Sequence, residues 1–287
     1  MSFNRAGLTA IFAICLWSSF ALIASSLKEL PPFFLLGISF LIGSSFGLIQ
    51  IKNCFPDRTN LMVGVLGLFL YHMFMFLAFR YAPALQVNLI NYIWPALIVF
   101  LSPWVNAKLR LNFYHYMGIG VSFAGIALLF GFDVFIHWNE SLFGKSMAFA
   151  AAITWAIYSV VLQKLKAVSV FSNAGICFIC SILSFLLSFS LGESWSHEIP
   201  WPQVILLGFG PMGLSFYCWD FAMRNGDPRV IGALAFLTPI LSNLWLVLFT
   251  HEIFLNNVFF SAVLVLLGCL LVNTDSIMNL IKTQNKG

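Results

Sequence analysis

The amino-acid sequence predicts an all-α membrane protein with ten transmembrane helices, arranged as two inverted five-helix repeats with both termini in the cytoplasm. Three observations lead to this fold class. The chain is 61% hydrophobic and only 8% charged, its Lys and Arg residues collect on alternate loops, and its two halves carry matching motifs. Soluble domains have about a quarter of their residues charged, so the composition is that of an integral membrane protein. Segments of alternating polar and apolar residues are lacking, which favours helices over an outer-membrane barrel.

Ten apolar runs are each long enough to cross a bilayer core, which takes roughly 20 helical residues. The predicted spans are 7–27, 32–51, 60–79, 83–105, 113–131, 144–163, 170–191, 203–223, 228–250 and 257–274. The first run resembles a signal peptide, but no small-residue cleavage site follows it. We therefore expect it to be retained as a transmembrane helix.

The positive charges predict which loops face the cytoplasm. With the N-terminus inside, eleven of the fourteen Lys and Arg residues fall on the inner side, as the positive-inside rule requires. The inner residues are Arg5, Lys52, Arg58, Lys108, Arg110, Lys164, Lys166, Arg224, Arg229, Lys282 and Lys286, and the outer ones are Lys28, Arg80 and Lys145. Loops 52–59, 108–112 and 164–169 should thus face inward, and loops 132–143 and 192–202 outward.

The two halves of the chain resemble each other. Residues 12–30 align with 150–168 at an offset of 138, and residues 77–97 align with 221–241 at an offset of 144. The matched pairs include Trp17 with Trp155, Arg80 with Arg224, and Pro95 with Pro239. Five spans per half is an odd number, so the second half enters the membrane from the opposite side. Inverted repeats of this kind are typical of secondary transporters, with the substrate site between the halves near the midplane. We expect repeats at 1–137 and 138–287, which together form one membrane domain.

The segment QVNLINYIWPALIVF, residues 86–100, places a proline in the middle of an apolar span. Proline cannot donate to the carbonyl four residues earlier, so Pro95 and Pro239 should free the carbonyls of Asn91 and Ala235. A free carbonyl is costly in lipid unless it faces protein or a wet cavity. Two breaks at matching depth predict that both helices line one cavity, although each proline could also be a kink that serves packing.

Polar and aromatic side chains near these breaks are the candidate substrate ligands. Amides can bind a carboxylate or an ammonium, and aromatic faces can bind apolar or cationic groups. For the histidine, a buried neutral ring bonded to a nearby carbonyl is an equally good interpretation. The candidates lie on one side of the broken span or at the centres of other spans: Trp17, Tyr71, His72, Asn88, Asn91, Tyr92, Trp94 and Trp155.

The remaining chemistry of the spans excludes several functions. Asp220 lies one helical turn before Arg224, which predicts an ion pair at the cytoplasmic edge rather than a proton carrier. Coupling to protons would then rest on His72 alone, so facilitated transport is favoured. No Lys or Arg lies at mid-depth to hold a phosphate ester.

The short motifs of the sequence indicate no cofactor. Cys177 and Cys180 form a C-x-x-C without further metal ligands, so packing is their expected role. The FGKS at 143–146 lacks the earlier glycine of a nucleotide-binding loop. We expect no metal, no cofactor, no nucleic-acid partner and no enzymatic activity.

Several motifs resemble a known family. The ten-helix pattern, LWSS at 16–19, LAFRYAPA at 77–84 and the proline-broken fourth span resemble the EamA-type branch of the drug/metabolite transporter superfamily. The VNLINYIWPAL at 87–97 is similar to a segment of its YddG-like aromatic amino acid exporters, apart from an insertion, NLI, between Val87 and Asn91. The resemblance implies an inner-membrane exporter whose central cavity is lined by aromatic side chains at Trp17, Tyr71, His72, Tyr92, Trp94 and Trp155.

The sequence therefore predicts a monomeric multi-pass transporter in a bacterial inner membrane. Its expected substrates are aromatic and other large neutral amino acids, exported by alternating access. A carrier of another metabolite such as S-adenosylmethionine remains a second hypothesis, because an aromatic cavity also suits an adenine or a sulfonium. A membrane scaffold without transport is a third, although the short inner loops leave no room for a signalling domain.

Overall fold

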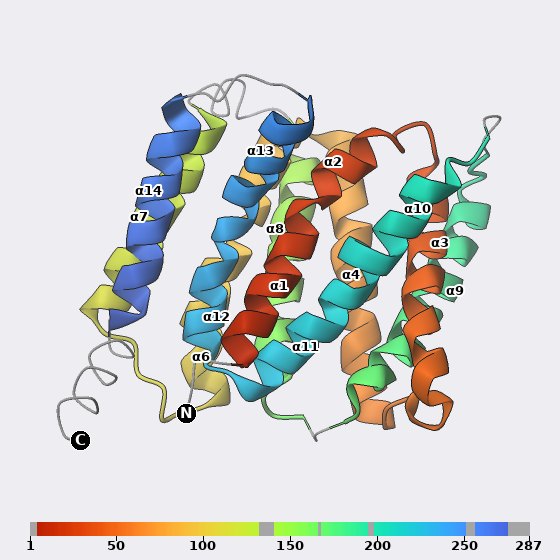
Figure 1. The fold of residues 1–287 in the computed structure, drawn as a ribbon, viewed down its shortest axis with the longest axis horizontal. Coiled ribbons are helices and arrows are strands. Elements are labelled where there is room, and N and C mark those ends of the chain that lie inside the picture. The colour runs from red at the N-terminus through yellow and green to blue at the C-terminus, as the bar shows by residue number, and fades with distance from the viewer. Residues whose placement is uncertain (1–4, 132–140, 166–167, 195–197, 251–255, 275–287) are drawn as a thin grey trace.

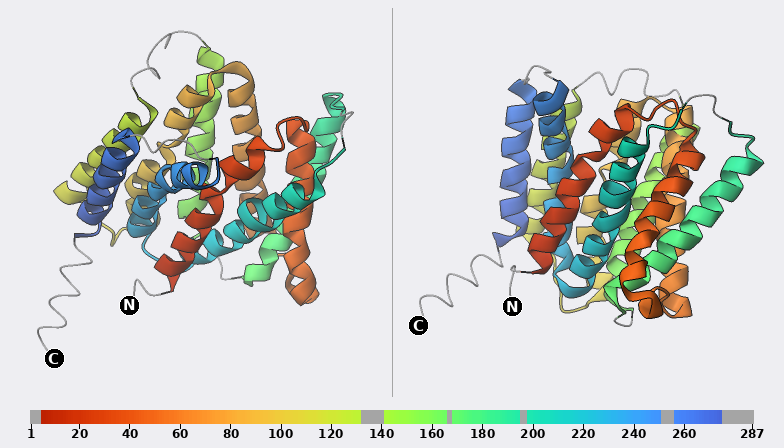
Figure 2. Two further views of the ribbon diagram at one scale, coloured as in Figure 1. Left: turned by 45° about the horizontal axis from the view of Figure 1, so that its top comes forward. Right: turned by 45° about the vertical axis from the view of Figure 1, so that its right-hand side comes forward.

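The computed structural model describes residues 5–131, 141–165, 168–194, 198–250 and 256–274. In this part of the chain every regular element is a helix. Figures 1 and 2 show the helices running between two common ends of one bundle, with the start of α1 and the end of α14 at the same end. We call this the lower end, as it lies at the bottom of Figure 1.

Helices occupy all ten predicted ranges, with ends that differ from the predicted ones by no more than two residues. The first half contains α1 (Ala6–Ser18), α2 (Phe20–Ser25), α3 (Pro32–Ser44), η1 (Ser45–Asn53), α4 (Arg58–Tyr81), α5 (Ala84–Asn91), α6 (Trp94–Val105) and α7 (Phe113–Phe130). The second half contains α8 (Leu142–Val161), η3 (Val170–Ser172), α9 (Asn173–Ser190), α10 (Trp201–Phe209), η4 (Gly210–Leu214), α11 (Ser215–Asn225), α12 (Pro228–Ala235), α13 (Leu237–Thr250) and α14 (Asn256–Val272).

Eight helical segments among the described residues are long and apolar enough to cross a membrane, judged by length and composition. They correspond to the first eight predicted spans. The last two ranges hold the broken helix α12–α13 and the shorter apolar helix α14. The fold is thus that of a multi-pass helical membrane protein, while the crossing of all ten segments and the cytoplasmic side of the termini stay predictions.

Both prolines stand at the start of a new helix after a break. The turn at Tyr92–Ile93 separates α5 from α6, and Pro95 is the second residue of α6. Proline suits this position because the first N–H groups of a helix have no partner within it. In the second half, α12 ends at Ala235 and Pro239 is the third residue of α13.

The expectation of a free carbonyl at Ala235 is wrong. The hydroxyl of Thr238 donates to that carbonyl over 2.8 Å, so a side chain replaces the backbone bond that Pro239 cannot make. Serine and threonine often satisfy carbonyls freed by proline in membrane helices in this way.

Four helix pairs dominate the packing: α7 with α14, α4 with α8, α3 with α9, and α1 with α11. Figures 1 and 2 show the α7–α14 pair at one edge of the bundle and the α3–α9 pair at the other. The helices between these edges surround the middle of the molecule, where the candidate site lies.

The predicted ion pair of Asp220 and Arg224 is confirmed. Arg224 Nε lies 2.7 Å from Asp220 Oδ1, and the same guanidinium donates through Nη2 to Asn60 Oδ1 at 2.7 Å. Asn60 in turn donates to Asp57 over 2.6 Å. The pair therefore fastens the last turn of α11 to the first turn of α4 at the lower end of the bundle.

The two cysteines of the C-x-x-C motif are buried as expected, and several other predictions fall on residues that the structure does not describe. Cys177 and Cys180 are both buried in α9, in the main hydrophobic core. The proposed repeat boundary at 137/138, the outer-loop residues 132–140, and Lys166, Lys282 and Lys286 lie outside the described residues.

Candidate functional site

A cavity of about 210 Å³ lies among α1, α2, α4, α5, α6, α8, η4, α11 and α13. This is room for far more than one water molecule. All eight candidate ligands predicted from the sequence line it. The lining residues are Trp17, Phe20, Tyr71, His72, Met75, Phe76, Phe79, Asn88, Asn91, Tyr92, Trp94, Trp155, Pro211, Met212, Phe216 and Thr238.

Three tryptophans from three helices line one side of the cavity, and a fourth, Trp219, packs behind them. The ring of Trp17 lies 5.0 Å from Trp219, 5.5 Å from Trp155 and 6.3 Å from Trp94, measured between centroids. The contacts with Trp94 and Trp155 are edge-on, a geometry that aromatic rings favour. Trp219 is fully buried behind the others and donates to Ser159 Oγ at 3.0 Å. Such a cluster gives the cavity a rigid apolar face.

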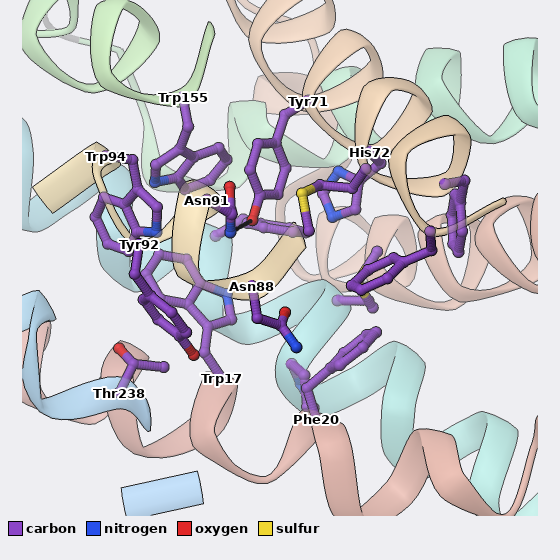
Figure 3. A pocket seen from close by; sticks show the side chains of 16 residues that line it. Trp17, Phe20, Tyr71, His72, Asn88, Asn91, Tyr92, Trp94, Trp155 and Thr238 are labelled. Atoms are coloured by element: carbon purple, nitrogen blue, oxygen red, sulfur yellow. Dashed lines mark hydrogen bonds between the residues drawn. The ribbon is translucent and has the colours of Figure 1, made fainter. Parts of the chain in front are cut away.

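The broken helix α5–α6 presents the polar face. The turn is held by bonds from Tyr92 N to Asn88 O at 2.9 Å and from Ile93 N to Ile90 O at 3.1 Å. It keeps Asn88, Asn91 and Tyr92 on the cavity side, as Figure 3 shows. Neither Pro95 nor Pro239 lines the cavity, so the prolines act through the shape of their helices.

Two hydrogen bonds fix the polar groups of the first half. Asn91 Nδ2 donates to the hydroxyl oxygen of Tyr71 at 3.2 Å (Figure 3). His72 Nδ1 lies 2.7 Å from the carbonyl oxygen of Leu68. The ring is therefore bonded to a carbonyl and also lines the cavity, so its contacts fit both interpretations, and its role in binding stays a prediction. Asn91 Oδ1 is buried and has no hydrogen-bond partner among the described residues.

Sequence reasoning missed eight of the lining residues. Met75, Phe76 and Phe79 follow His72 at helical spacing, and Phe20 follows Trp17 by three residues, so periodicity could have found them. Thr238 precedes Pro239 as Trp94 precedes Pro95, which the repeat could have indicated.

Pro211, Met212 and Phe216 reach the cavity through an irregular segment of the eighth span. Residues Gly210–Leu214 form a turn of π-helix between α10 and α11. Such turns within α-helices are rare and frequent at functional sites. The signal in the sequence is GPMG at 210–213, two glycines around a proline in the middle of an apolar span.

The lining predicts the chemistry of a ligand. None of the sixteen lining residues is Asp, Glu, Lys or Arg. The polar groups are a phenol pair, two amides, an imidazole and a hydroxyl, and the rest of the surface is aromatic or aliphatic. The cavity thus suits a molecule without net charge that has an apolar body and a compact polar group.

Comparisons with known proteins agree with this chemistry. The model of the EamA-like transporter family matches residues 5–131 and 142–274. The chain is 35% identical over 260 residues to the aromatic amino acid exporter YddG of Ancylobacter novellus, covering 86% of this chain and 89% of that protein. It is 24% identical to the aromatic amino acid exporter YddG of Escherichia coli strain K12, with coverage of 85% and 88%. A solved crystal structure 33% identical in sequence superposes with a TM-score of 0.87 over 95% of this chain and 99% of that one.

Proposed function

Because the chain belongs to the EamA-like transporter family, we propose that it exports aromatic and other large neutral amino acids across a bacterial inner membrane. The observation that carries the proposal is the cavity, which combines an aromatic face with uncharged polar groups at one side. An amino acid with a large apolar side chain likewise has an apolar part and a polar part, and the opposite charges of its ammonium and carboxylate give it no net charge. The relatives named as aromatic amino acid exporters support the same substrate class.

The packing supports alternating access between two inverted repeats. Residues related by the repeat meet near the middle of the bundle: the ring centroids of the matched Trp17 and Trp155 are 5.5 Å apart, and those of His72 and Phe216, which are paired when the second alignment is extended toward the N-terminus, are 5.7 Å apart. Each pair is related by the sequence offsets found above, 138 and 144. Contacts between equivalent residues are expected around a two-fold axis, which is the symmetry that lets one packing open to either side.

The state described here is closed at the lower end. Gln163 Nε2 donates to Gly226 O at 2.7 Å, Lys164 Nζ donates to Trp104 O at 2.9 Å, and Arg224 joins α11 to α4. The cavity lining reaches toward the other end of the bundle, with Phe79 two residues before the end of α4. We propose that the lower end faces the cytoplasm, so this state is outward-directed and opens inward when the polar contacts at the lower end separate.

Transport by purified protein in liposomes tests the proposal. Vesicles loaded with labelled phenylalanine should lose it faster with the protein than without it, and unlabelled tryptophan or leucine should compete. The tryptophan-rich face would also suit an adenine ring or a sulfonium, so S-adenosylmethionine belongs in the same assay. Flux of that compound without flux of amino acids would favour the second substrate, and no flux of any metabolite would favour a scaffold.

A further inference from the structure

The polar groups of the cavity are distributed unequally between the two halves. Tyr71, His72, Asn88, Asn91 and Tyr92 all belong to the first half, on α4, α5 and the turn that follows. The second half contributes a wall of Trp155, Pro211, Met212 and Phe216. Apart from the indole N–H of Trp155, its one polar lining side chain is Thr238, whose hydroxyl already donates a hydrogen bond to the Ala235 carbonyl. A substrate with one polar end is therefore expected to point that end toward α4 and α5.

The hydrogen bond of His72 determines which of its nitrogens can bind a ligand. A carbonyl oxygen only accepts, so Nδ1 carries the proton in the contact with Leu68. No lining residue is an acid that would pair with an imidazolium, and an unpaired buried cation is costly. In the neutral ring Nε2 is then an unprotonated acceptor. The ring is held by edge contacts to Tyr71 and Phe216, with centroids 4.9 and 5.7 Å away.

The neighbouring Tyr71 has the opposite character. Its hydroxyl oxygen accepts from the Asn91 amide, so its own proton stays available to donate. A hydroxyl that accepts a bond becomes a better donor, because chains of hydrogen bonds polarise one another. Figure 3 shows the Tyr71 hydroxyl beside Asn91, with the His72 ring on the same side of the cavity.

We infer that Tyr71 and His72 together recognise the zwitterion of an α-amino acid. The Tyr71 hydroxyl donates to the carboxylate, His72 Nε2 accepts from the ammonium, and Asn91 is a positioning residue that orients the Tyr71 proton. The side chain of the substrate then lies against Trp155, Met212 and Phe216. Both charged groups of an α-amino acid sit on one carbon, which matches a donor and an acceptor on adjacent residues of one helix. This assignment rests on the proposed function and adds a separate contact for each of the two charged groups.

Three ligands that share one aromatic ring test the assignment by equilibrium binding to the purified protein. Phenylalanine has both groups, phenethylamine lacks the carboxylate and 3-phenylpropionate lacks the ammonium. Tyr71→Phe should weaken phenylalanine and 3-phenylpropionate about tenfold or more, as expected for a lost hydrogen bond to a charged group, and leave phenethylamine unchanged. His72→Phe should weaken phenylalanine and phenethylamine similarly and spare 3-phenylpropionate.

Further variants separate recognition from folding. His72→Gln retains an acceptor and should recover part of the phenethylamine affinity. Asn91→Ala should show the ligand pattern of Tyr71→Phe with a smaller loss, which a merely structural role would not produce. Tyr81→Phe, on the same helix but outside the cavity, is the matched control and should bind all three ligands as the wild type does.

Two outcomes would overturn the assignment alone. Equal weakening of all three ligands by Tyr71→Phe and His72→Phe would mean that these residues only shape the cavity. Loss of phenethylamine rather than 3-phenylpropionate in Tyr71→Phe would mean that the hydroxyl accepts from the ammonium. Either result leaves a wild-type protein that still carries phenylalanine. If the wild type binds none of the three ligands and carries no amino acid, the proposed function fails and the assignment fails with it.

Discussion

Trp94 shows how one residue serves both the core and the cavity. It lines the cavity, yet only 4% of it is exposed, because its ring packs edge-on against Trp17 at 6.3 Å and Trp219 at 5.7 Å. An aromatic ring in such a position offers a substrate a fixed surface at little cost in entropy. Its neighbour Tyr92, in the turn before it, supplies a polar tip on the same wall.

Trp94→Ala is expected to lower the apparent affinity for phenylalanine about tenfold or more, since the lost contact is worth ~1–3 kcal/mol. Removing a buried Trp also leaves a hole in the cluster, so the thermal unfolding midpoint should fall. Initial transport rates against phenylalanine concentration measure the first effect. Trp104→Ala is the control, because Trp104 lies on the same helix and is 79% exposed. Wild-type transport by Trp94→Ala would show that α6 only packs the bundle.

Among the elements, the broken helix α5–α6 has the clearest mechanical role. The break aims Asn88, Asn91 and Tyr92 into the cavity, and Pro95 keeps the two helices from merging into one. In the second half, the π-turn at Gly210–Leu214 likewise directs side chains toward the cavity, although it does so by an irregular turn and not by a proline after a break. Irregular backbone in a membrane is tolerated where it faces protein or a cavity.

Pro95→Ala should slow the exchange between inward and outward states more than it weakens binding. Alanine restores an N–H that can bond to the Asn91 carbonyl, which favours one continuous helix. The maximal transport rate and the equilibrium affinity for phenylalanine are both measured, and the ratio of rate to affinity should fall relative to the wild type. Pro103→Ala serves as the control, since Pro103 lies inside the same helix, α6, but away from the break between α5 and α6. A Pro95→Ala protein with an unchanged ratio would exclude a role of the break in the transport cycle.

The contact between α4 and α11 is expected to contribute to the stability of the folded protein. The side chains of Arg224 and Asp220 are only 10% and 3% exposed, so Arg224→Ala would leave the buried Asp220 carboxylate without its positively charged partner. Breaking a buried pair in this way costs about 3–5 kcal/mol. Unfolding of the variant in mixed micelles should therefore occur at a distinctly lower denaturant concentration.

Arg229→Ala is the matched comparison for Arg224→Ala. Its partner is Asp227, and the side chains of this pair are 15% and 27% exposed. More solvent weakens an ion pair and also lowers the cost of losing one partner, so a loss of about 1 kcal/mol or less is expected. Equal losses in the two variants would mean that the Arg224 pair is far more hydrated than its burial indicates.

At the scale of the whole molecule, the distribution of positive charge predicts one orientation in the membrane. Figure 1 shows the start of α4 and the ends of α6 and α8 at the lower end, and the end of α4 and the connection from α2 to α3 at the other end. By the helix bounds, Arg58, Lys108 and Lys164 belong to the lower end, and Lys28 and Arg80 to the other. The positive-inside rule then predicts that the lower end faces the cytoplasm. The division into repeats at 1–137 and 138–287 stays a proposal, which the contacts between matched residues support.

Cysteine labelling in intact cells tests this orientation. In a variant whose six cysteines are replaced, Ser194→Cys should react with an impermeant thiol reagent added outside. Lys108→Cys should react only after the membrane is permeabilised. Labelling of Lys108→Cys from outside would reverse the orientation and would break the predicted alternation of ten spans.

The sequence by itself determined the helical architecture and half of the residues that line the candidate site. Lipid forces each spanning segment to satisfy its backbone within a helix, so apolar runs of about 20 residues locate the helices from composition alone. Polar residues at mid-span are costly without a role, and Trp and Tyr usually lie at the membrane interfaces, so Trp17, Tyr71, His72 and Asn91 could be chosen as candidates before any contact was known.

Only the tertiary structure decided how the helices turn toward one another and what each polar group does. The π-turn brings Met212 to the cavity, and Trp219 joins the tryptophan cluster from behind. Thr238 covers the Ala235 carbonyl, and Asn91 donates to a residue 20 positions away, Tyr71. In lipid the apolar pattern gives weak information on which face of a helix meets its neighbours, since lipid tails are as apolar as the core. Helix rotation is therefore set by packing and by individual hydrogen bonds, which depend on all the helices at once.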